Sequence, residues 1–105
     1  MAAYSVFQNL NPRTQAAIPF LLDVQSELLS GLGTRVVVPL YRSGAADVHA
    51  MSRLTPVVQF QGGPLVAMVP ELAGIARREL GPCAGDLASA RAEILQAMDL
   101  LLTGF

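Results

Sequence analysis

Residues able to do acid–base or metal chemistry are few in this chain and lie far apart. The 105 residues include one histidine, His49, and one cysteine, Cys83, in two unrelated stretches. A zinc site needs about four converging nitrogen, sulfur or oxygen ligands, and the scattered acidic residues do not complete such a set. We therefore expect no metal, no cofactor and no Cys–His catalytic pair. His49 is interpreted as a surface residue and Cys83 as a small buried thiol.

Asp23 is a carboxylate that interrupts an apolar run, "FLLDVQS". A buried carboxylate costs free energy unless it is hydrogen-bonded, so the position needs an explanation. Asp23 is either a general base or an acid bonded to nearby backbone or serine that pins a turn, and the second interpretation is favoured. The glycine pairs at 31/33 and 62/63 do not form a phosphate loop, because no lysine follows them.

Short β-prone segments separated by glycine and proline must position these residues. Alternation of apolar residues and β-branched runs predict strands, at 4–8, 16–29, 35–40, 55–61 and 64–70. Gly62-Gly63 lies between the last two and predicts a hairpin. The segment 71–75 is a candidate for a further short strand, 76–85 is interpreted as a connector, and 41–54 as a loop or short helical excursion.

From Asp86 onward the apolar residues recur every three or four positions, which predicts an amphipathic helix over 86–102. Asp86 is the expected N-cap and Gly104 the expected left-handed C-cap. The helical stripe consists of Leu87, Ala90, Ile94, Met98 and Leu101, widened by Leu95 and Leu102. The pattern as a whole predicts an α+β, mostly β fold: one domain over 1–105, with about five antiparallel strands in a small barrel and a C-terminal helix.

The composition favours association with other proteins. Hydrophobic residues make up 52% of the chain and charged residues 14%, against about 25% charged in a typical soluble domain. A small monomer cannot hide so many apolar side chains, so we expect a homodimer. The net charge is −1 and the seven arginines are scattered, which argues against direct nucleic-acid binding.

The same features favour a cytoplasmic protein that does not enter a membrane. The start of the chain has no basic segment followed by an apolar one, as a signal peptide would. No apolar run reaches about 18 residues. One cysteine cannot form an internal disulfide, which fits a reducing compartment.

Two apolar stretches are candidates for contact surfaces. Leu28 and Leu29 are adjacent beside a turn, and in a strand one of such a pair must face outward. The chain also ends in "DLLLTGF", residues 99–105, with nothing polar after Phe105. Each stretch either packs within the protein's own core or dimer seam, or is offered to a partner.

Four segments together resemble the CcdB toxins of bacterial toxin–antitoxin modules. They are "FLLDVQSELL", "TRVVVPL", "LTPVVQFQGGPLVAMVPELAGI" and the terminal "ILQAMDLLLTGF". Their order and spacing match from Tyr4 to Phe105, although the first loop, about 9–16, looks a few residues longer. The resemblance implies an SH3-like barrel with a C-terminal helix, shared with the MazF/Kid toxins. It also implies a homodimer that is not an enzyme, binds the A subunit of DNA gyrase, and is neutralised by a CcdA-like antitoxin, through whose complex it reaches operator DNA.

The resemblance also implies roles for particular residues. Those expected to contact gyrase are Leu28, Leu29, Asp99, Leu102, Thr103, Gly104 and Phe105. Those expected to bind antitoxin are Arg42, Ser43, Asp47 and Arg53, and those expected at the dimer interface are Tyr4, Met68, Met98 and Leu101. Thr103 stands where the family has tryptophan and Asp99 where it has asparagine, which departs from the pattern at the gyrase-contacting end.

Two alternatives remain open from the sequence. The first is a MazF-like endoribonuclease, which needs a base and an electrostatic stabiliser for the cleaved phosphate. Its candidates are His49, Asp23, Arg35 and Arg53. The near-neutral charge argues against it. The second is an inert family member that dimerises and binds antitoxin but has lost gyrase poisoning with the tryptophan.

Overall fold

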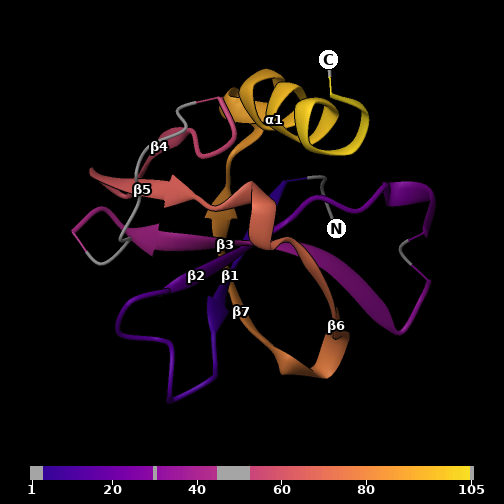
Figure 1. Cartoon of the computed structure of the whole chain (residues 1–105). Helices are drawn as coiled ribbons and strands as arrows, with labels where there is room; N and C mark the ends of the chain where they lie inside the picture. The colour runs from indigo at the N-terminus through magenta and orange to yellow at the C-terminus, as the bar shows by residue number, and fades with distance from the viewer. Residues whose placement is uncertain (1–3, 30, 45–52, 105) are drawn as a thin grey trace.

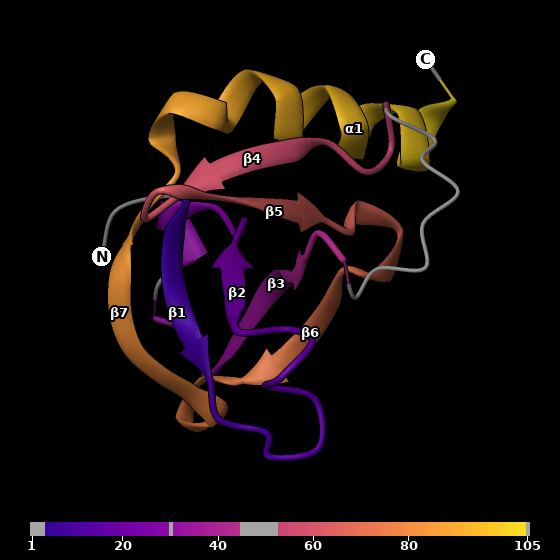
Figure 2. The ribbon, with the colours of Figure 1, turned by 90° about the vertical axis from the view of Figure 1, so that its left-hand side faces the viewer.

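The protein is an antiparallel sheet curled into a half-barrel, with one helix lying across its upper opening (Figures 1 and 2). The computed structural model describes residues 4–29, 31–44 and 53–104. The strands are β1 (Ser5–Asn9), β2 (Phe20–Asp23), β3 (Thr34–Arg42), β4 (Val57–Phe60), β5 (Gly63–Ala67), β6 (Ala73–Ala76) and β7 (Leu80–Asp86). The helix is α1 (Arg91–Thr103), and the 3-10 turns are η1 (Glu27–Leu29), η2 (Val69–Glu71), η3 (Arg77–Glu79) and η4 (Ala88–Ala90).

The long strand β3 organises the sheet. The strand order is β4-β5-β3-β2-β1-β7, and β6 also pairs with β3. On one edge β3 pairs with β2 through residues 37–40, and on the other it pairs with β6 through 34–37 and with β5 through 40–42. One strand thus holds three neighbours at different points along its length. The sheet therefore wraps around a core, and β6 closes toward β1 and β7 below (Figure 2).

The core lies between the curled sheet and α1. The fully buried apolar side chains alternate along the strands and meet one face of the helix. They include Val6, Leu22, Val38, Leu40, Val69 and Ile94. In the described part of the chain, no helix is long and apolar enough to cross a bilayer. The expected α+β, mostly β architecture with a C-terminal helix is confirmed.

The described part of the chain has seven strands where about five were expected, and the additional ones lie where sequence propensity is weakest. The segment 76–85, expected to be a connector, contains η3 and most of β7, while the candidate strand at 71–75 is present as β6. The β7 sequence "LGPCAGD" is poor in strand formers. Its pairing with β1 imposes the strand, and a Cβ at Gly81 would lie 2.8 Å from the carbonyl oxygen of Gln8.

The expected strand over 16–29 is wrong over most of its length. Only Phe20–Asp23 pairs with β1 and β3, and η1 follows at Glu27–Leu29. The alternation of apolar residues continues to Val24, but the Asp23 carboxylate accepts the N–H of Gln25 at 3.0 Å. This local bond turns the chain out of the sheet, since an Asx-type turn competes with the ladder.

The hairpin of β4 and β5 is confirmed, with its turn one residue earlier than Gly62-Gly63. Phe60 pairs with Gly63, which leaves Gln61 and Gly62 as the two loop residues. Their φ angles are 52° and 81°. Two positive φ values are the mark of a type I′ turn, whose twist suits a two-residue hairpin.

The helix begins five residues later than expected. Asp86 ends β7, and its carboxylate accepts the N–H of Ala88 at 2.9 Å. It therefore caps the 3-10 turn η4, while Ala90 occupies the N-cap of α1. The other end is as expected: Gly104 has φ 79° and donates its N–H to Leu100 O at 3.0 Å. This left-handed cap ends the helix.

Candidate protein-binding surface

A tight turn after β2 places leucine side chains in solvent. The N–H of Leu28 binds the Ser26 hydroxyl at 3.2 Å, and the N–H of Leu29 binds Ser26 O at 3.0 Å, which together fold η1. Because η1 is a 3-10 turn, the argument that one of two adjacent strand residues faces outward does not apply. Both leucines are exposed, Leu28 at 94%, and so is Leu32 just beyond. An exposed cluster of large apolar residues marks a contact surface.

A buried polar network fixes that turn from below. Asp23 is 1% exposed and Arg35 3%, and the Arg35 guanidinium binds the carboxylate through Nε at 2.8 Å and Nη2 at 2.7 Å. The expectation that Asp23 pins a turn is confirmed by its bond to Gln25 N–H. Arg35 Nη1 is buried without a hydrogen-bond partner in the described structure. The guanidinium is thus held chiefly by Asp23.

Gln25 links this network to the exposed leucines. Its side-chain oxygen accepts the N–H of Val36 at 3.0 Å, and its side-chain nitrogen donates to Leu29 O at 3.0 Å. The same side chain therefore ties η1 to β3 while its backbone is held by Asp23. A surface fixed before binding loses less conformational entropy on association, so the leucines are presented in a preorganised position.

A groove runs from this turn to the first half of α1. It has a volume of about 580 Å³ and is lined by Tyr4, Val24, Gln25, Ser26, Glu27, Leu28, Arg91 and Leu95. Tyr4 anchors its floor, because its N–H binds Asp23 O at 3.1 Å and its carbonyl accepts the N–H of Leu87 at 2.8 Å. Burial raises the pKa of Tyr4, and the nearby charge of Arg91 partly opposes the rise.

The apolar helix face continues past the groove to the end of α1. Leu102 lies seven residues beyond Leu95 on the same face, which is about 10 Å along the axis. Leu102 is 72% exposed and Leu101 is also exposed, so the stripe continues after the core has ended. The Thr103 hydroxyl donates to Asp99 O at 2.6 Å and is therefore occupied within the helix. Phe105 lies outside the described residues.

Within one protomer the expected gyrase-contacting residues form two groups. Leu28 and Leu29 lie beside the first half of α1, and the second group, Asp99 with Leu102, Thr103 and Gly104, lies at its far end. The helix face that carries Leu95 and Leu102 connects them. The residues expected at the dimer interface are less uniform: the protomer itself buries Tyr4, half-buries Met68 and Met98, and exposes Leu101.

The residues expected to bind antitoxin lie in two separate hollows. Arg42 and Ser43 line one of about 470 Å³ that also contains Phe20 and Phe60. The two rings pack edge to face with centroids 5.1 Å apart, and Arg42 Nε donates to Ala16 O at 2.9 Å. Arg53 lines another hollow of about 180 Å³ with Pro56, Glu93 and Gln96. Asp47 lies outside the described residues.

The residues expected to do chemistry do not assemble. Asp23 and Arg35 are buried against one another, so neither can touch an RNA substrate without opening the core. No three His, Cys, Asp or Glu side chains within the described ranges are grouped to hold a metal. His49 lies outside those ranges. Cys83 is exposed rather than buried: it lies on β7 opposite Phe7 of β1, and its thiol donates to Gly85 O at 3.5 Å.

Some residues of this surface were not singled out from the sequence. Val24 and Arg91 line the groove, and Leu32 adds to the exposed leucines. The signal for Leu32 was present, since a leucine between two glycines, "GLG", lies in a turn that cannot bury it. Val24 and Arg91 gave no such signal, because tertiary packing alone brings them to the same groove.

The fold and the surface define a small half-barrel protein with a preorganised apolar contact surface. The chain matches the family model described as CcdB protein over residues 3–104, and it belongs to the CcdB family. No curated protein gives a significant match. The CcdB family comprises toxins of toxin–antitoxin modules, which are generally poisons of DNA gyrase.

Proposed function

We propose that this protein is the toxin of a bacterial toxin–antitoxin module and inhibits DNA gyrase by binding its A subunit. The observation that carries the proposal is Leu28, 94% exposed on a turn that a buried network holds in place. A leucine kept rigidly in water is unfavourable for an isolated protein and favourable for one whose partner covers it. Family membership supplies the class of partner.

The contact residues proposed are Leu28 and Leu29 on η1, and Asp99, Leu102, Thr103, Gly104 and Phe105 at the end of the chain. Exposure of Leu102 and of the Gly104 cap supports the second group. Leu95, which shares the groove with Leu28, lies about 10 Å along α1 from Leu102, so a target must span the helix face, or reach both groups across a dimer. Contact alone is sufficient for this mode of action, and we propose no catalytic step.

The same proposal includes the partners of the toxin. It acts as a homodimer through Tyr4, Met68, Met98 and Leu101. A CcdA-like antitoxin binds Arg42, Ser43, Asp47 and Arg53, and operator DNA is contacted through the antitoxin. The protein works in the bacterial cytoplasm, where gyrase acts.

Induced expression in a bacterium, paired with a purified-gyrase assay, tests the proposal. Expression should stop growth, and the protein should increase gyrase-dependent cleaved DNA. Leu28→Glu should abolish both effects, because a charge replaces the central apolar contact. Val57→Glu is the matched control, since Val57 is an exposed apolar residue on the edge strand β4. Harmless expression, or cleaved RNA in place of cleaved DNA, would contradict the proposal.

The inert-member alternative rests on one observation, Thr103 in the position of the family tryptophan. An interfacial tryptophan is often worth about 2 kcal/mol or more, and the Thr103 hydroxyl is already bonded to Asp99 O. Thr103→Trp discriminates between the alternatives. If the native protein is harmless and the variant arrests growth, the scaffold is competent and lacks only this contact. Poisoning by the native protein excludes the inert alternative.

A further inference from the structure

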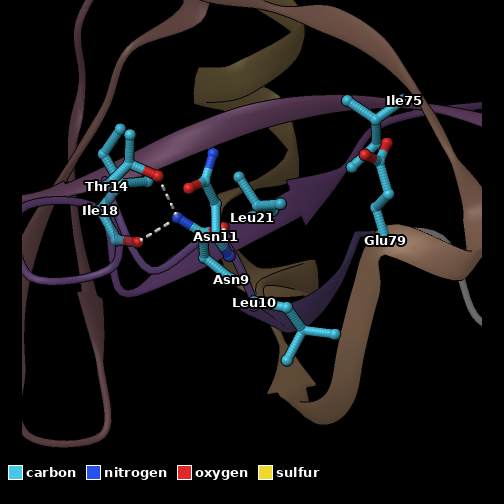
Figure 3. Close-up of a pocket in the computed structure, with 8 residues that line it drawn as sticks. All are labelled: Asn9, Leu10, Asn11, Thr14, Ile18, Leu21, Ile75 and Glu79. Carbon is cyan, nitrogen blue, oxygen red and sulfur yellow. Dashed lines mark hydrogen bonds between the residues drawn. The ribbon is translucent and has the colours of Figure 1, made fainter.

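A further hollow lies at the end of the half-barrel opposite α1, where the β1–β2 loop and the segment β6–η3 lie in Figure 2. It has a volume of about 370 Å³ and is lined by residues of these two segments (Figure 3). Four of its lining side chains are apolar: Leu10, Ile18, Leu21 and Ile75. The polar ones are Asn9, Asn11, Thr14 and Glu79. A space of this size holds one or two side chains of a partner.

The loop wall of this hollow is rigid. Asn9 donates through Nδ2 to Thr14 Oγ1 at 2.9 Å and to Ile18 O at 2.8 Å (Figure 3). Its Oδ1 accepts the N–H of Asn11 at 3.0 Å. The side-chain Oδ1 of Asn11 then accepts the N–H of Arg13 at 2.9 Å. One asparagine side chain thus braces both ends of the loop, and the hollow exists before any ligand arrives.

The opposite wall is held by the turn η3. Glu79 Oε2 accepts the N–H of Ala76 at 3.2 Å, and the N–H of Arg77 binds Gly33 O at 2.8 Å. In Figure 3 the loop residues Thr14 and Ile18 stand on one side of the hollow, and Ile75 and Glu79 stand on the other. The two walls come from segments about 60 residues apart in the chain, and both are fixed by their own hydrogen bonds.

The two walls also carry free positive charge. Arg13 lies in the loop between two lining residues, and Arg77 and Arg78 precede Glu79 in η3; all three arginines are exposed. The buried ion pair of Arg35 with Asp23 involves none of these three arginines. Three arginines against one glutamate give these segments a charge of +2, whereas the whole chain carries −1. The positive charge is therefore concentrated at this end of the molecule.

We propose that this hollow is a docking site for an acidic peptide segment that inserts one apolar side chain. The apolar walls take the side chain, Asn11 offers its amide to the peptide, and the arginines attract flanking carboxylates. A nucleic acid fits less well. The hollow has no aromatic lining residue on which a base can stack, and the chain as a whole is acidic. The hollow shares no lining residue with the Leu28 groove. The proposal can therefore be tested independently of gyrase binding.

Peptide titration of the isotopically labelled full chain, followed by NMR amide shifts, tests the proposal. The probe is a five-residue peptide with a central leucine and two acidic residues on each side. We expect shifts confined to the residues around the hollow. Replacing the probe's leucine by alanine, or making the protein Arg77→Glu, Arg78→Glu double variant, should weaken binding by about tenfold. The double variant Gln59→Glu, Ala92→Glu, which adds negative charge at exposed positions that do not line the hollow, is the control and should bind within about twofold of the native protein.

Three results would overturn the proposal. One is the absence of localised shifts at millimolar peptide. Another is equal binding of a peptide with lysines in place of the acids, since charge would then play no part. The third is tighter binding of a decathymidine oligonucleotide at the same residues, which would make the site a nucleic-acid surface. Unchanged amide spectra of the double variant away from η3 would show that it folds, so that a loss of binding is attributed to charge.

Discussion

At the scale of single residues, the structure depends on an ion pair that water cannot reach. Asp23 and Arg35 meet because β2 and β3 pair with Asp23 opposite Val37, which brings the two side chains together across the sheet. A buried pair adds little stability compared with apolar residues, but removing one partner leaves an uncompensated charge. The pair instead positions the chain, because the Asp23 carboxylate also accepts the N–H of Gln25 and so starts the turn that carries Leu28.

Asp23→Ala should therefore destabilise the protein strongly. The loss leaves the Arg35 guanidinium, 3% exposed, without its carboxylate, and we expect a decrease of about 3–5 kcal/mol in the free energy of unfolding. Urea denaturation measures it. Glu93→Ala, at an exposed helix position, should change stability by no more than about 0.5 kcal/mol. A loss below about 1 kcal/mol for Asp23→Ala would show that the pair does not organise the fold.

Tyr41 gives a prediction about pH. Its hydroxyl donates to Glu71 at 2.5 Å, and this bond, followed by burial and the carboxylate charge, raises the pKa of Tyr41 from 10.0 to about 12. The folded state thus favours the neutral phenol. The associated stability is fully present below pH 10 and is lost as pH rises toward 12. Ultraviolet titration of tyrosinate in a Tyr4→Phe background should find the midpoint well above 10, and Glu71→Gln should lower it. An unchanged midpoint in that variant would contradict the assigned cause.

Residue-scale prediction from sequence succeeded where the cause is local and failed where it is not. The turn at Asp23 follows from an acid two residues before a backbone N–H, so the sequence "DVQS" contained it. The partnership with Arg35, twelve positions away, depends on strand register, which no local pattern specifies. Cys83 was expected to be buried because thiols usually are, but its exposure depends on the face of the sheet on which the pairing of β7 with β1 places it.

At the scale of elements, the β4–β5 hairpin offers a test with a matched pair of glycines. Gly62 has φ 81°, where a Cβ is strained, whereas Gly63 pairs with Phe60 outside that region; neither has a neighbour within 4 Å of an added Cβ. Gly62→Ala should lower the free energy of unfolding by about 1–2 kcal/mol. Gly63→Ala should have a markedly smaller effect. Thermal denaturation of the two variants compares them, and equal effects would mean that the turn is not type I′.

The elements predicted well are those whose pattern agrees with their surroundings. The β-branched run in β3, the hairpin and most of α1 combine propensity with burial, and each was expected near its observed place. The predictions for β7 and for the second half of the segment 16–29 were wrong. β7 is rich in glycine and proline yet pairs with β1, and Glu27–Leu29 contains two leucines yet forms a 3-10 turn. Long-range pairing and side-chain capping overrode propensity in both.

At the scale of the whole molecule, the apolar stripe of α1 is longer than the core beneath it. Ile94 and Ala97 are buried, Met98 is half-buried, and Leu101 and Leu102 are exposed. The first part of the stripe therefore packs on the sheet, and its last turn is exposed to solvent. The sequence showed the whole stripe but not where the core ends under it, because that depends on how the helix packs against η2 and the sheet.

Two variants should separate self-association from target binding. Leu101→Glu places a charge at the proposed dimer seam and should convert dimers to monomers in analytical ultracentrifugation at micromolar concentration, because an apolar interface tolerates a buried unpaired charge poorly. Leu28→Glu alters an exposed turn outside that seam and should leave the dimer intact while removing gyrase inhibition. Both positions are exposed in the protomer, so both variants should fold, which circular dichroism verifies. If Leu28→Glu yields monomers and Leu101→Glu does not, the turn is the dimer seam, and the topoisomerase contact must be sought along the helix end instead.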